Sequence, residues 1–170
     1  MSGRAPRILS VGLLILLLTG CGWHLRGTLP GQPSLDSVEV ALDTRVGTGD
    51  LYREVRNALQ ASGAEVVSPR EGVPVLVLRS ERRQNRRISG GRTTDIQEYE
   101  LRFEVDWELL DGDGEPLVER TTFRQFRNYR FDQSQVLGSE GQEDVLVTEL
   151  QRDAAMLIRE RVQATVGRID

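Results

Sequence analysis

The sequence has little of the chemistry that enzymes need, because its 170 residues include one cysteine, Cys21, and one histidine, His24. A catalytic triad or a protein metal site needs several such side chains that converge in space. A single cysteine also allows no disulfide within the chain, so the stability of the fold must come from packing. No glycine-rich segment has the spacing of a phosphate-binding loop. We therefore expect no catalytic residues, no metal site and no cofactor.

Lysine is absent, and every basic side chain apart from His24 is arginine. The formal net charge is -4 at pH 7, and loss of an N-terminal signal containing Arg4 and Arg7 would make it more negative. General nucleic-acid binding depends on neutralising phosphates, so we expect no nucleic-acid partner. Any basic function is therefore local. Arginine suits such a function, because its planar fork binds a phosphate or a carboxylate through two donors.

The N-terminal segment has the organisation of a secretory signal. Arg4 and Arg7 precede an apolar stretch, residues 8–18, that is too short to span a bilayer. The order Leu-Thr-Gly-Cys, ending at Cys21, then matches a lipobox, in which the cysteine becomes the acylated first residue of the mature protein. We predict a signal peptide over residues 1–20 and lipidation of Cys21. The alternative is an ordinary signal peptide with an unmodified cysteine.

Lipidation of Cys21 would anchor the protein firmly, because several acyl chains bury many more methylenes than the single chain that binds marginally. Gly22 follows the cysteine, where an aspartate would favour retention in the inner membrane. We therefore expect a lipid anchor in the outer membrane with the protein facing the periplasm. Residues 21–34 form the anchor and a tether rich in proline and glycine. Residues 35–170 are sufficient for one domain.

Local patterns predict the elements of that domain. A helix capped by Thr48 or Asp50 ends near Ser62, with Gly63 as its stop. A last helix begins at Ser139, which forms a capping box with Gln142. Its apolar stripe is Val145, Leu146, Leu150, Ala154, Leu157, Ile158 and Val162. Strands are expected over residues 37–42, 73–79, 99–109 and 117–131, and a further short one over 64–67.

The clearest periodic signal runs from Tyr99 to Leu109, where apolar and charged residues alternate. This pattern is typical of a strand with one buried face, and it places the acids on the other, solvated face. A three-residue turn at Gly112 would pair Phe103 with Phe123 and Asp106 with Arg120. The turn contains acids but lacks the spacing of a calcium loop. The acids of this strand fit a solvated face or a partner surface better than a catalytic pair. They are Glu98, Glu100, Glu104, Asp106 and Glu108.

Two amphipathic helices and strands with one wet face predict an α+β fold. We expect a two-layer sandwich in which an antiparallel-rich, mixed sheet of about four strands carries both helices on one face.

Several segments resemble the LPS-assembly lipoprotein LptE (RlpB) family. The most specific is the start of the mature chain, Cys-Gly-Trp-His-Leu-Arg at residues 21–26. Supporting segments are residues 55–59 with Gly63 behind them, the strand entry at Glu98, the return strand over 126–131, and the last helix over 143–161. Together they cover essentially the whole mature chain.

The resemblance implies a non-enzymatic lipoprotein that forms a hetero-dimer with the LptD β-barrel. It would plug the barrel lumen, assist barrel assembly and contact lipopolysaccharide (LPS). Some members carry a basic residue before the last helix, whereas residues 138–141 here are neutral to acidic. The alternative function is a free-standing lipid carrier, which would need an apolar cavity of several hundred Å3.

Five arginines are the candidate LPS contact, because lipid A and the inner core carry phosphates and carboxylates. They flank a flexible turn at Ser89 in an otherwise acidic protein. The alternatives are a solvated hairpin tip, or arginines that pair with acids of the barrel. The five are Arg82, Arg83, Arg86, Arg87 and Arg92.

Overall fold

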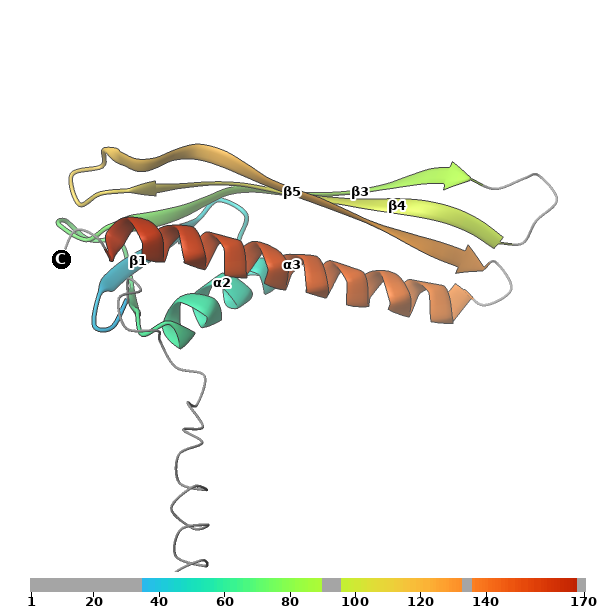
Figure 1. Cartoon of the computed structure of the whole chain (residues 1–170), viewed down its shortest axis with the longest axis horizontal. Coiled ribbons are helices and arrows are strands. Elements are labelled where there is room, and N and C mark those ends of the chain that lie inside the picture. Colours follow the sequence, from blue (N-terminus) through green and yellow to red (C-terminus); the bar gives the residue numbers. More distant parts are fainter. Residues whose placement is uncertain (1–34, 90–95, 133–135, 168–170) are drawn as a thin grey trace, which may run out of the picture. The chain divides into compact units, whose positions relative to one another are not determined.

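A computed structural model describes residues 35–89, 96–132 and 136–167, which belong to one unit, Pro33–Asp170. The unit is a five-stranded sheet with two helices on one of its faces (Figure 1). The elements in chain order are β1 (Glu39–Thr44), α2 (Asp50–Ala61), β2 (Glu65–Val67), β3 (Val75–Ser89), β4 (Ile96–Leu110), β5 (Pro116–Asp132) and α3 (Val136–Val166).

The sheet is mixed, with strand order β2-β1-β3-β4-β5. The strand β1 is parallel to both of its neighbours, and the β3, β4 and β5 strands form an antiparallel meander. The expected α+β fold is therefore confirmed. It has five strands rather than about four, because the short segment Glu65–Val67 pairs with β1.

The helix α2 ends as its sequence predicts. Gly63 follows it in the left-handed region, with φ at 93°, and Ala64 donates a backbone hydrogen bond to the carbonyl of Leu59. A Cβ on Gly63 would collide with the Asp36 side chain. The other end differs from the prediction, because the N-cap is Gly49 and no side chain caps the helix. The first turn is packed through Leu51, which is buried, so tertiary contact replaces the missing cap.

The helix α3 begins at Val136, three residues before the predicted cap. Ser139 and residues 138–141 therefore lie inside the helix, and both the capping box and the loop expected there are wrong. Serine is only mildly unfavourable in a helix, so its presence does not force a helix to begin there. Val145 and Leu157 of the predicted stripe are exposed. Among residues 141–166 of α3, the buried ones are Val147, Leu150, Gln151, Ala154, Ala155, Ile158, Val162 and Val166.

The hairpin between β4 and β5 turns through Asp111, whose side chain accepts hydrogen bonds from the backbone of Asp113 and Glu115 at 2.9 and 2.8 Å. The predicted register is wrong along most of the hairpin, because Phe103 pairs with Gln125. Two irregularities near the turn shift the pairing by two residues. A shift of two keeps every side chain on its expected face. The rings of Phe103 and Phe123 therefore still meet, with centroids 6.5 Å apart.

The core lies between the sheet and the helices. The alternating residues of β4 supply its centre: Leu101, Phe103, Val105, Trp107 and Leu109 are all buried. Leu51, Val55 and Leu59 of α2 join this cluster, as do the buried apolar residues of α3. Across the described ranges, no helix has both the length and the apolar character to cross a membrane.

Candidate functional site

The arginine segment lies on a strand rather than in a loop. The sequence predicts a strand that ends near Arg79, but β3 continues to Ser89. Its second half pairs with β4 without interruption from Ser80, opposite Asp106, to Arg87, opposite Tyr99. Arg82 helps to stabilise the extension, because it lies opposite Glu104 and forms an ion pair with it at 3.0 Å. Opposite charges on directly paired strand residues stabilise such a ladder.

Strand alternation divides the candidate arginines between two faces of the sheet. Arg82 and Arg86 lie on the outer face, opposite the acids of β4. Arg83 and Arg87 lie on the helix side, opposite Phe103 and Tyr99. Arg92 lies outside the described residues. The four described arginines therefore do not form one cluster on a single face.

The two arginines nearest the centre of the sheet have carboxylate partners within the chain. Arg82 lies 3.0 Å from Glu104 and 3.7 Å from Asp106, and Arg83 lies 3.6 Å from Glu81. Within the described ranges, Arg86 and Arg87 have no ion pair, and both are exposed. Arg86 and Arg87 therefore keep all their guanidinium donors for a ligand, whereas Arg82 and Arg83 keep only some of theirs.

The acids of β4 form a row between arginines of both neighbouring strands. Glu104 accepts hydrogen bonds from Arg124 at 2.5 Å and from Arg82 at 3.0 Å. These two hydrogen bonds, led by that from Arg124, lower the pKa of the Glu104 carboxyl. Glu108 accepts a bond of 2.8 Å from Arg79 in the same way. The row is thus a charge-paired surface and not a set of free carboxylates.

Asp106 is the most enclosed acid of this row and is only 6% exposed. Its carboxylate accepts bonds from the hydroxyls of Thr122 at 2.7 Å and Ser80 at 2.9 Å, and from Arg120 at 3.1 Å. The Thr122 bond is the largest cause of a lowered pKa, and with the other donors it outweighs burial and holds the pKa at about 2. Asp106 therefore stays ionised and ties together β3, β4 and β5.

Glu143 of α3 links the helix to the far part of the sheet. It accepts hydrogen bonds from Tyr129 of β5 at 2.8 Å and from Asn85 of β3 at 2.6 Å. Burial, together with the Glu143 carboxylate, raises the pKa of the Tyr129 hydroxyl. Arg127 adds a second link, 2.9 Å from Asp153. These contacts hold the polar part of the sheet against α3.

Phe126 is a candidate contact residue that the sequence analysis did not select. It lies on the outer face of β5, opposite Arg102, and it is 61% exposed. Arg124 and Arg130 lie two and four residues from it, on the same face of β5. An aromatic ring among arginines provides apolar contact next to charge. Its position in the sequence could have indicated this exposure, because strand alternation places Phe126 on the face opposite to that of the buried Phe123 and Tyr129.

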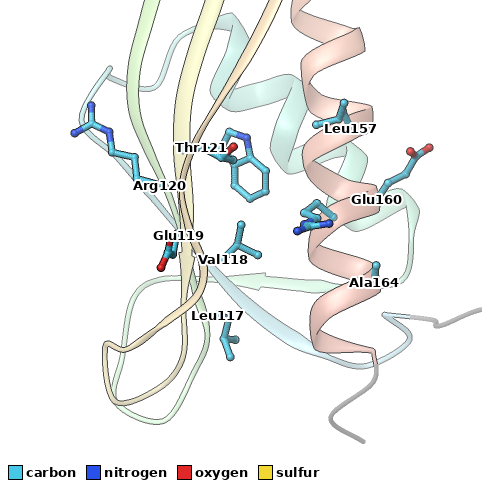
Figure 2. Close-up of a pocket in the computed structure, with 10 residues that line it drawn as sticks. Leu117, Val118, Glu119, Arg120, Thr121, Leu157, Glu160 and Ala164 are labelled. Carbon is cyan, nitrogen blue, oxygen red and sulfur yellow. The ribbon is translucent and has the colours of Figure 1, made fainter.

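A surface groove of about 760 Å3 lies between β5 and α3 (Figure 2). Leu117, Val118 and Leu157 provide apolar contact along it. Trp107 also lines the groove, and its indole Nε1 is buried with no hydrogen-bond partner among the described residues. Four charged side chains line it as well: Glu119, Arg120, Glu160 and Arg161. The groove is therefore not the apolar cavity that a lipid carrier needs.

The described residues contain no group of three or more histidine, cysteine, aspartate or glutamate side chains that could hold a metal ion. What they do present is a charge-paired sheet face, an exposed aromatic residue and a strand rich in arginine. Fold and surface together define a small α+β protein suited to binding through its surface.

The comparisons with known proteins identify the family. The LptE family, described as lipopolysaccharide-assembly, matches residues 35–162, and the chain belongs to this family. It is a family of non-enzymatic lipoproteins of the Gram-negative envelope.

Similar sequences have the same family name. The LPS-assembly lipoprotein LptE of Pectobacterium atrosepticum is 29% identical over 151 residues, which cover 86% of this chain and 79% of that protein. The LptE protein of Yersinia enterocolitica is 28% identical over 150 residues, which cover 87% of this chain and 70% of that protein.

Solved structures share the fold. The rare lipoprotein B of Shewanella oneidensis superposes with a TM-score of 0.67 at 24% identity, over 77% of this chain and 98% of that chain. Lipoprotein B of Nitrosomonas europaea gives a TM-score of 0.68 at 23% identity, over 82% of this chain and 92% of that chain. At these identities the likeness supports the fold alone.

Proposed function

We propose that this chain is an outer-membrane lipoprotein subunit of the LPS translocon. Residues 35–170 act as a plug for an LptD-like β-barrel and assist its assembly as one half of a hetero-dimer. Membership of the LptE family is the observation that carries this proposal. The architecture supports it, because the apolar side chains form a packed core while the outer sheet face is polar and charge-paired. A polar exterior suits the lumen of a large barrel.

The partner is tested by purifying the tagged full chain from detergent-solubilised outer membrane. A large β-barrel should co-elute in about equal amount. Recovery of the chain without a barrel, but with bound lipid, would instead favour the free-standing carrier. The groove between β5 and α3 does not favour a lipid carrier, because charged residues line much of it.

The anchor is the second part of the proposal. Cys21 becomes the acylated first residue of the mature protein, and residues 21–34 tether the domain to the membrane. Mass spectrometry of the purified N-terminus should find the acylated cysteine. The Cys21→Ser variant should accumulate as an uncleaved or mislocalised precursor. An unmodified Cys21 in the wild-type protein would contradict this part alone.

LPS contact is the third part, and we assign it to the arginine segment Arg82, Arg83, Arg86, Arg87 and Arg92. Arg86 and Arg87 are the strongest candidates, because neither has an ion pair within the described ranges. Phosphates bound there would be held by charge-assisted hydrogen bonds. Binding should weaken with salt, because exposed charges are screened beyond about 8 Å at physiological ionic strength.

The test compares two double variants with the same change of charge. Arg86→Glu with Arg87→Glu should weaken binding of LPS by the full chain across a salt series. Arg45→Glu with Arg56→Glu is the matched control, because both of these arginines are exposed and lie outside β3. Equal LPS binding by the two double variants would remove Arg86 and Arg87 from the site. Loss of barrel co-purification with unchanged LPS binding would assign Arg86 and Arg87 to the protein interface.

A further inference from the structure

The second half of β3 is an open strand edge. In its first half, up to Leu78, β3 pairs with β1 on one side and with β4 on the other. From Ser80 to Arg87 it pairs with β4 alone, in a register without irregularity. No other strand of the described residues lies along its free side. Along these eight residues, the backbone N–H and C=O groups of every second residue therefore face the free side and have no partner strand.

The side chains along this edge are polar on both faces. The helix α3 packs against β5 and β4. Among the described residues, its hydrogen bonds to β3 involve the amide of Asn85 and the carboxylate of Glu81. Six consecutive residues, 82–87, are exposed. From Arg82 to Arg87, both faces of β3 are therefore left exposed by the helices.

The charges along the edge have a regular spacing. Two arginine pairs, Arg82-Arg83 and Arg86-Arg87, flank the uncharged Gln84 and Asn85. Because side chains alternate, each pair places one guanidinium on the outer face and one on the helix side. A strand added at this edge would meet arginines above and below it at two points along its length.

The spacing of the arginines favours some partner strands over others. A second copy of β3 would bring arginines against arginines, and like charges on neighbouring strands are unfavourable. A strand with acidic pairs at the same spacing would instead form ion pairs on both faces, while its backbone completed the ladder. Strand addition of this kind is a common mode of peptide recognition, in which backbone hydrogen bonds give affinity and side chains give specificity.

We propose that the free edge of β3, from Ser80 to Arg87, binds an extended acidic segment of a partner protein as an additional strand. This goes beyond the proposed function, because the contact is made with a protein backbone and holds whichever protein supplies the strand. It also differs from phosphate binding, which needs the guanidinium groups but not the backbone edge.

The first test uses the full chain in detergent and the peptide Thr-Glu-Glu-Thr-Thr-Glu-Glu-Thr, whose acids match the arginine spacing in either direction. The same peptide with glutamine in place of glutamate is the control. We expect the acidic peptide to bind at least about tenfold more tightly, a difference of about 1.4 kcal/mol. Hydrogen exchange should show new protection of amides between Ser80 and Arg87. Binding without such protection, or equal binding of both peptides, would overturn the proposal.

The second test separates the backbone from the charges. In an antiparallel pair, the N–H groups of consecutive residues point alternately toward the partner strand and away from it. One of Gln84→Pro and Asn85→Pro therefore removes a donor from the β4 ladder, and the other removes a donor from the free edge. Asn85→Pro also loses the side-chain hydrogen bond to Glu143, so its melting temperature is compared with that of Asn85→Ala, whereas Gln84→Pro is compared with the wild type. The proline variant that melts like its reference identifies the free-edge position. If both proline variants melt below their references, hydrogen exchange of the wild-type chain identifies the free-edge position, because an amide without a partner strand exchanges faster.

The tolerated proline variant should lose binding of the acidic peptide by at least about tenfold and should keep LPS binding, because all its arginines are intact. Peptide binding equal to wild type in that variant would overturn strand addition. Loss of LPS binding in the Arg86→Glu, Arg87→Glu double variant tests the LPS contact separately. The two proposals can therefore fail independently.

Discussion

The two halves of β3 have the same secondary structure, but one half is buried and the other is largely exposed. Leu76, Val77 and Leu78 are all buried, and this half has a neighbouring strand on each side. From Ser80 to Arg87 the strand is polar on both faces and has one neighbour. An irregularity in the pairing with β4 separates the halves at this point. A strand that is apolar on both faces is enclosed, whereas one that is polar on both faces is left for contact with other molecules.

The largest loss of stability is expected from a change in the enclosed half of β3. Leu78→Ala should lower the free energy of unfolding by about 2–5 kcal/mol, because a fully buried leucine leaves a cavity. Arg87→Ala in the open half should change it by less than about 0.5 kcal/mol, as is usual for an exposed residue. Chemical denaturation of both variants measures the contrast. Similar losses in the two variants would show that the open half is also part of the stable core.

The elements β1, α2 and β2 pack beside the enclosed half of β3, and Gly63 forms the turn between α2 and β2. Gly63→Ala should cost about 1–3 kcal/mol, because its backbone is left-handed, and its Cβ would also strike Asp36. Gly47→Ala is the matched control, since Gly47 has φ at 84° and open space around it. The difference in melting between the two variants isolates the Asp36 contact. No difference would mean that the chain relaxes around that collision.

Asp106 lies near the boundary between the halves, and its effect depends on pH. Its pKa of about 2 lies below the ordinary value of 3.8, so its stabilisation is complete above about pH 4 and is lost as the pH falls toward about 2. Asp106→Asn should cost about 1 kcal/mol at neutral pH, because hydrogen bonds to a charged acceptor are weakened. Denaturation between pH 2 and pH 7 should give a flatter profile for the variant. Parallel profiles would assign the acid sensitivity to other carboxylates.

The smallest effect on stability is expected at Phe126, on the outer face beside the open half. Phe126→Ser should change the free energy of unfolding by less than about 0.5 kcal/mol, because the ring is mostly exposed. If the ring contacts a ligand or partner, the same variant should weaken LPS binding or barrel co-purification. A loss of stability without any loss of binding would make Phe126 a packing residue.

The enclosed part of the fold was largely predictable from sequence. The alternation from Tyr99 to Leu109 identified the buried face of β4, and Gly63 marked the end of α2. The register along β5 was not predictable, because two irregularities near the turn shift the pairing by two residues. The start of α3 was missed for a similar reason, since a local cap signal does not report where tertiary contacts sustain a helix.

The candidate site was predictable in composition but not in arrangement. The arginine segment stood out in an acidic chain, and its four described arginines are exposed. The division of its arginines between the two faces of the sheet depends on the segment being a strand, which the sequence did not predict. The ion pairs of Arg82 depend on Glu104 and Asp106, more than twenty residues away in sequence, and no local pattern specifies such pairs.

The position of β1 has a consequence for the order in which the protein assembles. It is the first strand along the chain, yet it lies between β2 and β3, so both of its neighbours come later. The meander of β3, β4 and β5 needs only consecutive segments, and such short-range pairing forms fastest. We expect β1 to dock late, onto a meander that already exists. Pulse-labelling hydrogen exchange during refolding should then find protection in β4 before β1, and the reverse order would show that the N-terminal unit nucleates the fold.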